Sequence, residues 1–518
     1  VESGQSDVFI AVVFQTLALR ITAIQRMMKV PRHPMRLFFA ILAIGGLILI
    51  LSMQFLPPVD IQSQSHPLMN LATNKLDKED GIIKNQPKEL SLLNFKTVDT
   101  LEKHDKVQYF MVFSTSCSKF QDWQAMAFFH FAKKVNQPGN VTRLVSGCKA
   151  EKAQELTIIH NERIAPLNPG FQMHITPDFG VEDDQKYWNK PFGLLHWMEN
   201  VLGFPNRASE YNDAIIIIVD PDMMLLRPIT HDFTNYKTTW AGQFRGNVVT
   251  HGLPIAQKYA YGSAWLTSLK GNVSYVVGPD SPIHTMSLIE ADSYYPAGPP
   301  YLATGKDMYA IAKAWVKFLP RIHDIFPEFM AEMHAYSTAA AHLGLPHQLT
   351  PGFMVSDVGA DEGFDFLNSV TRAEVCDPQL EVTDLPLVLH YCQRYALGRW
   401  FFSKYKLPED FFTCEAPLLR EPPTNVAEIY DWNAFPNGIE GENFFRRKAL
   451  HHTVLHGWML CTVIYSLNAI SISLKQRFCN ETANFDKTWH FHNDTLFQAS
   501  LADTTNPFER DHLKDNPG

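Results

Sequence analysis

One short run constrains the fold of this chain more than any other: residues 214–219 are Ala-Ile-Ile-Ile-Ile-Val. Such a continuous β-branched run predicts a strand that is buried on both faces, as in a mainly parallel sheet. Strand and helix patterns alternate around it, which indicates an α/β fold with a central sheet flanked by helices. Further strands are predicted at Val107–Phe113, Thr142–Ser146 and Leu385–His390, and helices at Lys190–Glu199, about 327–343 and Ala449–Lys475.

Composition excludes several classes of protein. Of the 518 residues, 46% are hydrophobic and 19% are charged, which is too apolar for a disordered chain. The formal net charge of -9 leaves no global basic footprint for a nucleic-acid partner. A mean hydropathy of -0.14 is too polar for a protein with many membrane spans. We therefore expect a largely globular protein.

One segment departs from that average, because residues 37–56 are 20 consecutive residues without a charge, the length that a helix needs to cross a bilayer. Five Lys or Arg side chains lie between positions 20 and 36, and none follows until Lys75. The positive-inside rule then predicts a cytoplasmic N-terminus and a lumenal remainder, a type II topology.

The predicted parts are a cytoplasmic segment (1–36, part of it a candidate gene-model extension), a transmembrane signal anchor (37–56), a lumenal stem (57–106), a catalytic domain (107–430) and a C-terminal extension packing on that domain (431–518).

Two further features agree with a lumenal destination. Four N-x-S/T glycosylation triplets follow the predicted anchor, at Asn140, Asn272, Asn480 and Asn493. All seven cysteines also follow it, where disulfides can form, and their odd number leaves at least one unpaired. Proximity in the sequence favours Cys117 with Cys148 and Cys461 with Cys479, although spacing alone leaves the connectivity open.

The predicted central strand ends in Asp220-Pro-Asp222. Ligands of a doubly wound sheet gather at the carboxyl ends of its strands, so both carboxylates are expected to face one crevice. Two close carboxylates repel each other unless a cation lies between them. Mg²⁺ or Mn²⁺ suits such oxygen ligands and often completes its shell with substrate phosphates. The alternative is an ordinary turn, since Asp and Pro are common turn formers.

Three functions are compatible with an Asp-x-Asp after a hydrophobic strand. A sugar-nucleotide glycosyltransferase uses the carboxylates to hold a metal that bridges the donor's diphosphate. An aspartyl-phosphate phosphatase uses the first Asp as nucleophile and usually has Thr or Val four residues later, where this chain has Met224. The third is a non-catalytic lumenal protein that binds glycans or assists assembly. The predicted stem, lumenal side and glycosylation triplets favour the glycosyltransferase.

Five stretches of sequence occur in a specific order: Phe113–Gln124, Pro138–Leu144, Asn189–Phe192, Asp220–Asp222 and Leu389–Trp400. Together they resemble the hydroxyproline O-arabinosyltransferases and the related peptidyl-serine α-galactosyltransferases, over roughly residues 107–420. The resemblance implies a GT-A-type fold, a Golgi or endoplasmic reticulum membrane location, a UDP-sugar donor, a Mn²⁺-like metal and retention of anomeric configuration. It also implies transfer of arabinose or galactose to a hydroxyproline or serine of a secretory-pathway protein. The arabinosyltransferases carry Glu where this chain has Asp220, which leaves donor and acceptor open.

The candidate metal ligands are Asp220, Asp222 and His390. His390 ends a predicted strand, and the family resemblance places it as a late nitrogen ligand of the same metal; its alternative is a side chain that is only hydrogen-bonded. The candidate catalytic residues are Asp220, Asp222 and Glu332. Glu332 and Tyr336 lie one helical turn apart and can face the sugar or the acceptor, with a solvated helix face as the alternative.

The candidate contacts to the donor nucleotide are Ser114, Thr115, Arg143 and Asp220. Ser114 and Thr115 are expected in a loop after the first strand, near the uracil or ribose, with turn formation as the alternative. Arg143 suits a bidentate contact to the diphosphate, with an ion pair as the alternative. Lys404 and Arg399 are candidates to offset charge on the leaving group.

Overall fold

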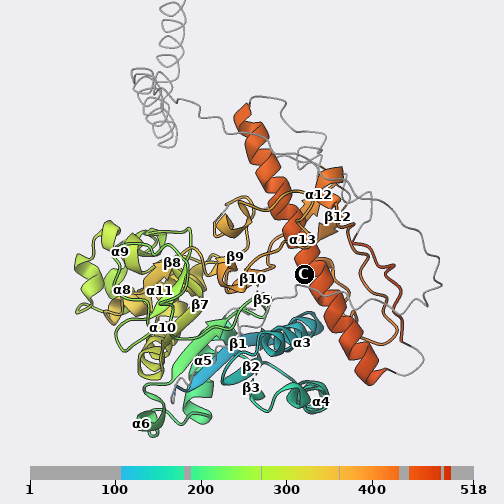
Figure 1. The fold of residues 1–518 in the computed structure, drawn as a ribbon. Helices are drawn as coiled ribbons and strands as arrows, with labels where there is room; N and C mark the ends of the chain where they lie inside the picture. Colours follow the sequence, from blue (N-terminus) through green and yellow to red (C-terminus); the bar gives the residue numbers. More distant parts are fainter. Residues whose placement is uncertain are drawn as a thin grey trace, which may run out of the picture. The chain divides into compact units, whose positions relative to one another are not determined.

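A computed structural model describes residues 107–179, 188–269, 271–360, 362–398, 400–430, 443–479 and 483–491 (Figure 1). They belong to one compact unit, Lys88–Gly518. The predicted cytoplasmic segment, signal anchor and stem (1–36, 37–56 and 57–106) lie outside the described residues, so the type II topology built on them stays a prediction.

The centre of the fold is a seven-stranded sheet in the order β3-β2-β1-β4-β7-β6-β8. All neighbours are parallel except that β7 runs antiparallel to β4 and β6. The prediction of an α/β fold with a mostly parallel sheet flanked by helices is confirmed. The strands are β1 (Tyr109–Ser116), β2 (Asn140–Ser146), β3 (Phe171–Thr176), β4 (Ile215–Val219), β6 (Ile255–Lys258), β7 (Ala297–Thr304) and β8 (Gln348–Thr350).

Strand β4 carries the isoleucine run and lies between β1 and β7. All of its residues are buried. Its side chains alternate between two cores, because Ile217 packs in the core on one face while Ile216 and Ile218 pack in the core on the other. The burial of both faces that the run predicts is thus confirmed. Helix α3 (Lys119–Lys134) contributes to the first core, and α5 (Asn189–Asn200), α10 (Gly305–Ile325) and α11 (Ala331–His342) contribute to the second (Figure 1).

A separate three-stranded sheet, β5-β10-β9, extends the fold beyond the end of β4. The strand predicted at Leu385–His390 is present here as β10 (Val388–His390), three residues shorter. It does not join the central sheet, because it pairs antiparallel with β5 (Met223–Leu225) and parallel with β9 (Met354–Val355). A two-stranded hairpin, β11 (Tyr395–Leu397) and β12 (Trp400–Phe402), follows.

Two long helices cover the second face of the central sheet. The helix predicted near residues 327–343 is shorter and forms α11. The 21-residue α10 before it was not predicted, and it contains Pro320, a residue that usually ends or kinks a helix. The remaining shorter helices are α4 (Ala150–Ile159), α6 (Ala208–Tyr211), α7 (Ala264–Thr267), α8 (Val273–Val277), α9 (Leu288–Tyr294) and α12 (Val426–Ile429).

Helix α13 (Asn443–Phe478) contains the helical stretch predicted near the C-terminus. Its segment His451–Phe478 is long and apolar enough to cross a membrane by length and composition, but 83% of its most apolar window is buried inside the protein. Polar groups on α13 are bonded to the domain: Asn468 Nδ2 donates to the Leu419 carbonyl at 2.8 Å. It therefore packs as a core helix against neighbours that include β11 and β12.

Three disulfides are present among the described residues, and one predicted pairing is wrong. Cys117 pairs with Cys148, as proximity in the sequence predicted. Cys461 does not pair with Cys479: the bridges are Cys376–Cys461 and Cys414–Cys479, which tie α13 to residues 85 and 65 positions away. The physical reason is that Cys461 lies within α13 and Cys479 directly follows the end of that helix, 18 positions later, which is about 27 Å along the helix axis at 1.5 Å per residue. The free cysteine is Cys392.

Candidate functional site

Asp220, Asp222 and His390 come together at the carboxyl end of β4, although 168 positions separate Asp222 from His390. The chain turns after β4, with the Met223 amide donating to the Asp220 carbonyl at 3.2 Å, and continues into β5. Antiparallel pairing sets His390 opposite Met223. The Tyr391 amide also donates to the Asp222 carbonyl, at 3.1 Å. The backbone of the small sheet therefore positions the third side chain.

The geometry of these three side chains suits a divalent cation. Their candidate ligand atoms all lie within 4.8 Å of one another, and His390 Nε2 lies 3.2 Å from Asp222 Oδ1. Ligand atoms that share an ion at about 2.1–2.3 Å lie roughly 3–4.5 Å apart. Asp222 is 4% exposed and His390 is 9% exposed, so the cluster is largely shielded from water. Two carboxylates and one imidazole form a donor set that binds such ions.

Each carboxylate of the pair already contacts a partly buried lysine. Lys190 Nζ, in the first turn of α5, lies 2.8 Å from Asp220 Oδ1. Lys404 Nζ lies 2.5 Å from Asp222 Oδ2. Lys404 was a candidate from the sequence, but Lys190 was not, and the signal that could have found it is the Asn189–Phe192 stretch that resembles the family. We call Asp220, Asp222, Glu332, His390, Lys190 and Lys404 the charge cluster.

Mutual attraction favours the charged forms of four members of this cluster: Asp222, Lys190, Lys404 and His390. Burial acts to raise the pKa of Asp222, but Lys404 and His390 outweigh it and hold that pKa far below its usual range. Burial acts to lower the pKa of Lys404 and of Lys190, and their carboxylate partners raise both pKa values instead. Burial likewise opposes the charged form of His390, yet Cys392 and Asp222 raise its pKa well above the usual value.

Glu332 joins the charge cluster through Lys190. Its Oε2 atom lies 3.3 Å from Lys190 Nζ, and the side chain of this α11 residue is 7% exposed. Burial raises the pKa of Glu332, and Lys190 opposes that shift. Its second oxygen, Oε1, is buried without a hydrogen-bond partner. Tyr336, by contrast, is a core residue that stacks on Tyr301 with ring centroids 3.8 Å apart.

Ser114 lies beside this cluster but on a strand and not in a loop, because its neighbour Phe113 pairs with Val219, the residue before Asp220. Ser114 and Thr115 belong to β1, which continues to Ser116, so the prediction of a loop there is wrong. Thr115 is 1% exposed and accepts a hydrogen bond from Arg143 Nε at 2.9 Å. The loop begins later because β1 keeps its parallel pairing with β2 through Ser116.

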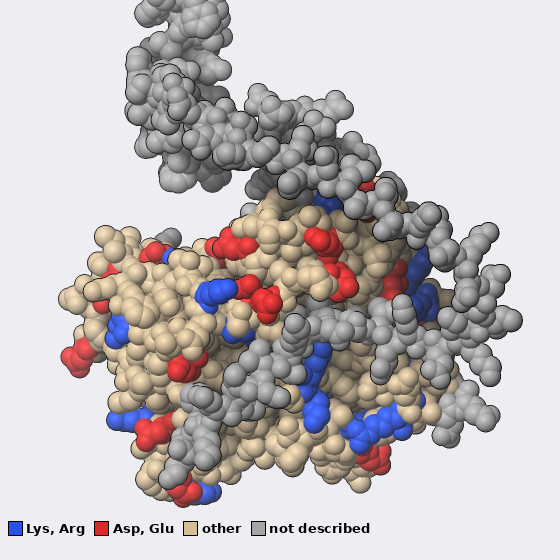
Figure 2. All heavy atoms as spheres, viewed as in Figure 1, with Lys and Arg blue, Asp and Glu red and all other residues tan. Residues whose placement is uncertain are grey.

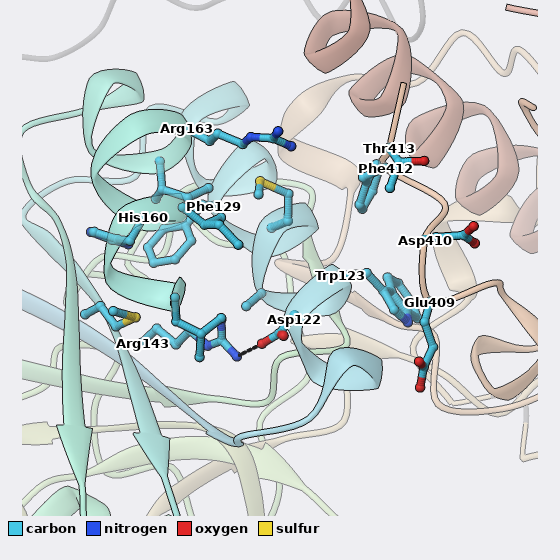
Figure 3. Close-up of a pocket in the computed structure, with 16 residues that line it drawn as sticks. Asp122, Trp123, Phe129, Arg143, His160, Arg163, Glu409, Asp410, Phe412 and Thr413 are labelled. Atoms are coloured by element: carbon cyan, nitrogen blue, oxygen red, sulfur yellow. Dashed lines mark hydrogen bonds and ion pairs between the residues drawn. The ribbon is translucent and has the colours of Figure 1, made fainter. Parts of the chain in front are cut away.

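Arg143 lines a cavity of about 150 Å³ between α3, α4 and the loop at residues 409–413 (Figure 3). Its Nη2 atom lies 2.7 Å from Asp122 Oδ1, an ion pair that Figure 3 shows at one end of the cavity. Most of the remaining lining is apolar, with Met126, Phe129 and Leu156 among its side chains. The ion-pair alternative for Arg143 is therefore the one that the structure contains. We call this region the Arg143 cavity.

Trp123 connects the two regions. It lines the Arg143 cavity, and its ring stacks on Tyr391, the residue after His390, at a centroid distance of 6.2 Å.

Arg399, a candidate to offset charge on the leaving group, lies outside the described residues. On the face seen in Figure 2, positive and negative side chains are interspersed among uncharged ones.

No family model matches the chain. A peptidyl serine α-galactosyltransferase from Arabidopsis thaliana is 24% identical over 311 residues, which cover 57% of this chain. The match spans 31% of the relative's own length. The chain is thus similar, at a distance, to a peptidyl serine α-galactosyltransferase, and the resemblance of its motifs to that glycosyltransferase family is confirmed.

Proposed function

We propose that this protein is a glycosyltransferase that moves a sugar, arabinose or galactose, from a UDP-sugar to a serine or hydroxyproline hydroxyl of a secretory-pathway protein. The observation that carries the proposal is the buried group of Asp220, Asp222 and His390 at the carboxyl end of β4. That edge of an α/β sheet is where nucleotide ligands bind. The similarity to a peptidyl serine α-galactosyltransferase supports the same class of reaction.

In the proposed mechanism Asp220, Asp222 and His390 would hold Mn²⁺ or Mg²⁺. Such an ion would supply positive charge that stabilises a departing diphosphate. Lys404, at 2.5 Å from Asp222, would donate hydrogen bonds to the diphosphate. Glu332 offers its unpaired Oε1 as an acceptor for a hydroxyl of the sugar or of the acceptor. Retention of configuration and a GT-A-type fold are part of the proposal and follow from the resemblance.

We also propose that the protein works in the lumen of the Golgi or endoplasmic reticulum, held by the predicted anchor at residues 37–56. Three disulfides support this location, because such bonds persist in oxidising compartments and are rare in the cytosol. The proposed catalytic domain (107–430) contains the whole charge cluster, and the proposed C-terminal extension (431–518) contains α13.

The test is to replace Asp222 by Asn, which keeps the shape of the side chain and removes its charge. We expect Mn²⁺-dependent UDP-sugar hydrolysis and transfer to Ser and Hyp peptides to fall by at least about 100-fold, while circular dichroism stays that of the parent protein. Products are identified by mass spectrometry across a panel of UDP-sugars.

Asp384→Asn is the matched control, since Asp384 pairs with Lys237 at 2.5 Å on the surface and should tolerate the change. Full activity in Asp222→Asn would remove this carboxylate from the mechanism. Release of phosphate from an aryl phosphate, with fluoroberyllate trapped at Asp220 and no sugar transfer, would instead support the phosphatase interpretation.

A further inference from the structure

The two carboxylates proposed to bind a cation are already neutralised by the chain itself. Lys190 and Lys404 have side-chain exposures of 17% and 13%, and they contact Asp220 and Asp222, which are 19% and 6% exposed. Charges buried this far from water are costly unless they are paired. The ammonium groups therefore supply, in the described structure, the positive charge that a divalent cation would supply.

The two lysines differ in what else they contact. Lys190 has a second carboxylate partner, because its Nζ lies 3.3 Å from Glu332 Oε2 as well as 2.8 Å from Asp220. Lys404 has Asp222 as its one carboxylate partner among the described residues, and otherwise lies 4.9 Å from the Tyr405 ring centroid. If Asp220 and Asp222 turn to a cation, Lys190 keeps a counter-ion and Lys404 loses its own.

A lysine without a counter-ion in this position needs another anion. A divalent cation held by the same carboxylates repels an ammonium group a few ångströms away, and a buried unpaired ammonium group is unfavourable. Lys404 is flexible enough to leave, since its stem has four rotatable carbons. The anion that the proposed function brings to this edge of the sheet is a diphosphate.

We propose that Lys190 and Lys404 are internal competitors of the cation, and that Lys404 passes from Asp222 to the donor's diphosphate when a cation is bound, while Lys190 stays on Glu332. The inference rests on the proposed metal-dependent function. Cation and nucleotide then favour the same state, the one in which Lys404 has left Asp222. Linkage requires that each increases the affinity for the other by the same factor. In this role Lys190 and Glu332 are positioning residues.

The test measures binding and not turnover, with Lys404→Met in the full chain. Methionine keeps an unbranched stem and removes the charge. Free Mn²⁺ is followed by electron paramagnetic resonance, and UDP binding by calorimetry with and without Mn²⁺. We expect Lys404→Met to bind Mn²⁺ about tenfold more tightly without UDP, and the factor by which Mn²⁺ strengthens UDP binding to fall at least about fivefold.

Lys190→Met separates the two lysines. It should also tighten Mn²⁺ binding, because it removes a competitor, but it should leave the coupling between Mn²⁺ and UDP close to that of the parent protein. Because this change leaves Glu332 buried without its partner, the double variant Lys190→Met with Glu332→Gln keeps the experiment valid if the single variant does not fold. Lys237→Met, in a surface Lys–Asp pair, is the control and should change neither quantity.

The outcomes separate this inference from the proposed function. If the parent protein binds Mn²⁺ and Lys404→Met binds it no more tightly, the lysine exchange is wrong and the metal site stands. If the parent protein and all of the lysine variants bind no Mn²⁺, the proposed metal site and this inference both fail. If Mn²⁺ binds to Lys404→Met but not to the parent protein, the competition by Lys404 is supported and metal-dependent transfer is overturned.

Discussion

The charge cluster and the Arg143 cavity both contain an arginine or lysine paired with a carboxylate, yet the carboxylates differ in which of their oxygens remain unbonded. In the cavity, Arg143 donates to Asp122 and to Thr115, and Asp122 also lies 3.4 Å from Lys152. In the cluster, Glu332 Oε1 has no hydrogen-bond partner. Asp220 and Asp222 each contact a lysine and are also candidate ligands of a cation. We take the carboxylate with both oxygens bonded as structural, and the Glu332 carboxylate, with one unbonded oxygen beside the candidate cation site, as the one that a ligand can complete.

Arg143→Met is expected to have the largest effect on stability. It removes the buried partner of the ion pair and leaves Asp122, which is 22% exposed, with only partial compensation from Lys152. We expect a loss of about 3 kcal/mol in the free energy of unfolding, measured by urea denaturation, with unchanged Mn²⁺ affinity. If the variant is as stable as the parent protein but has lost Mn²⁺ or UDP binding, the prediction that Arg143 contacts the donor's diphosphate would be supported instead.

His347→Gln tests whether a histidine that is buried without a carboxylate partner responds to pH in the opposite way to His390. His347 is fully buried beside Tyr336, 2.9 Å from its hydroxyl, and burial lowers the pKa of His347 to about 3. His390, which faces a carboxylate, has its pKa raised instead. A lowered histidine pKa means that the unfolded state binds more protons below about pH 6.5, so stability falls as the pH falls.

Replacing His347 removes that dependence. Between pH 7 and pH 5 we expect the parent protein to lose about 2 kcal/mol more stability than His347→Gln does. Urea denaturation of both proteins at both pH values gives the stability that each loses between pH 7 and pH 5. Any stability that the substitution costs at every pH cancels in that comparison. Equal losses in the two proteins would show that His347 titrates normally, and the assignment of a lowered pKa would then be wrong.

His390→Gln is expected to have the smallest effect of the three. Glutamine keeps a side-chain amide that can hydrogen-bond Asp222 but does not replace the imidazole as a ligand. We expect Mn²⁺ affinity to fall about tenfold, roughly 1.4 kcal/mol, with little change in the urea midpoint. His174→Gln is a control, because His174 pairs with His196 outside the charge cluster. If Mn²⁺ affinity is unchanged in His390→Gln, His390 is not a ligand and the proposed site consists of the two carboxylates alone.

Much of the candidate site could be predicted from the sequence, because its parts are local. The isoleucine run predicts β4, the Asp-Pro-Asp that follows it predicts a pair of carboxylates at the sheet edge, and His390 ends a strand of its own. Lys190 could not be found by the same reasoning, since a lysine in the first turn of a helix has no pattern that names its partner. Ser114 and Thr115 were misplaced because small polar residues occur both in turns and in buried strands.

The α/β class, the buried central strand and the carboxylates at its end could be predicted from the sequence alone, since hydrophobic periodicity and strand ends are properties of neighbouring residues. Which distant groups meet at that strand end depends on the tertiary structure. It paired β10 with β5, which brings His390 to Asp222, and it brought α5 and α11 together so that Lys190 lies between Asp220 and Glu332. It also paired Cys461 with Cys376, 85 positions away. Such contacts depend on how whole elements pack, and the order of residues within one element does not contain that information.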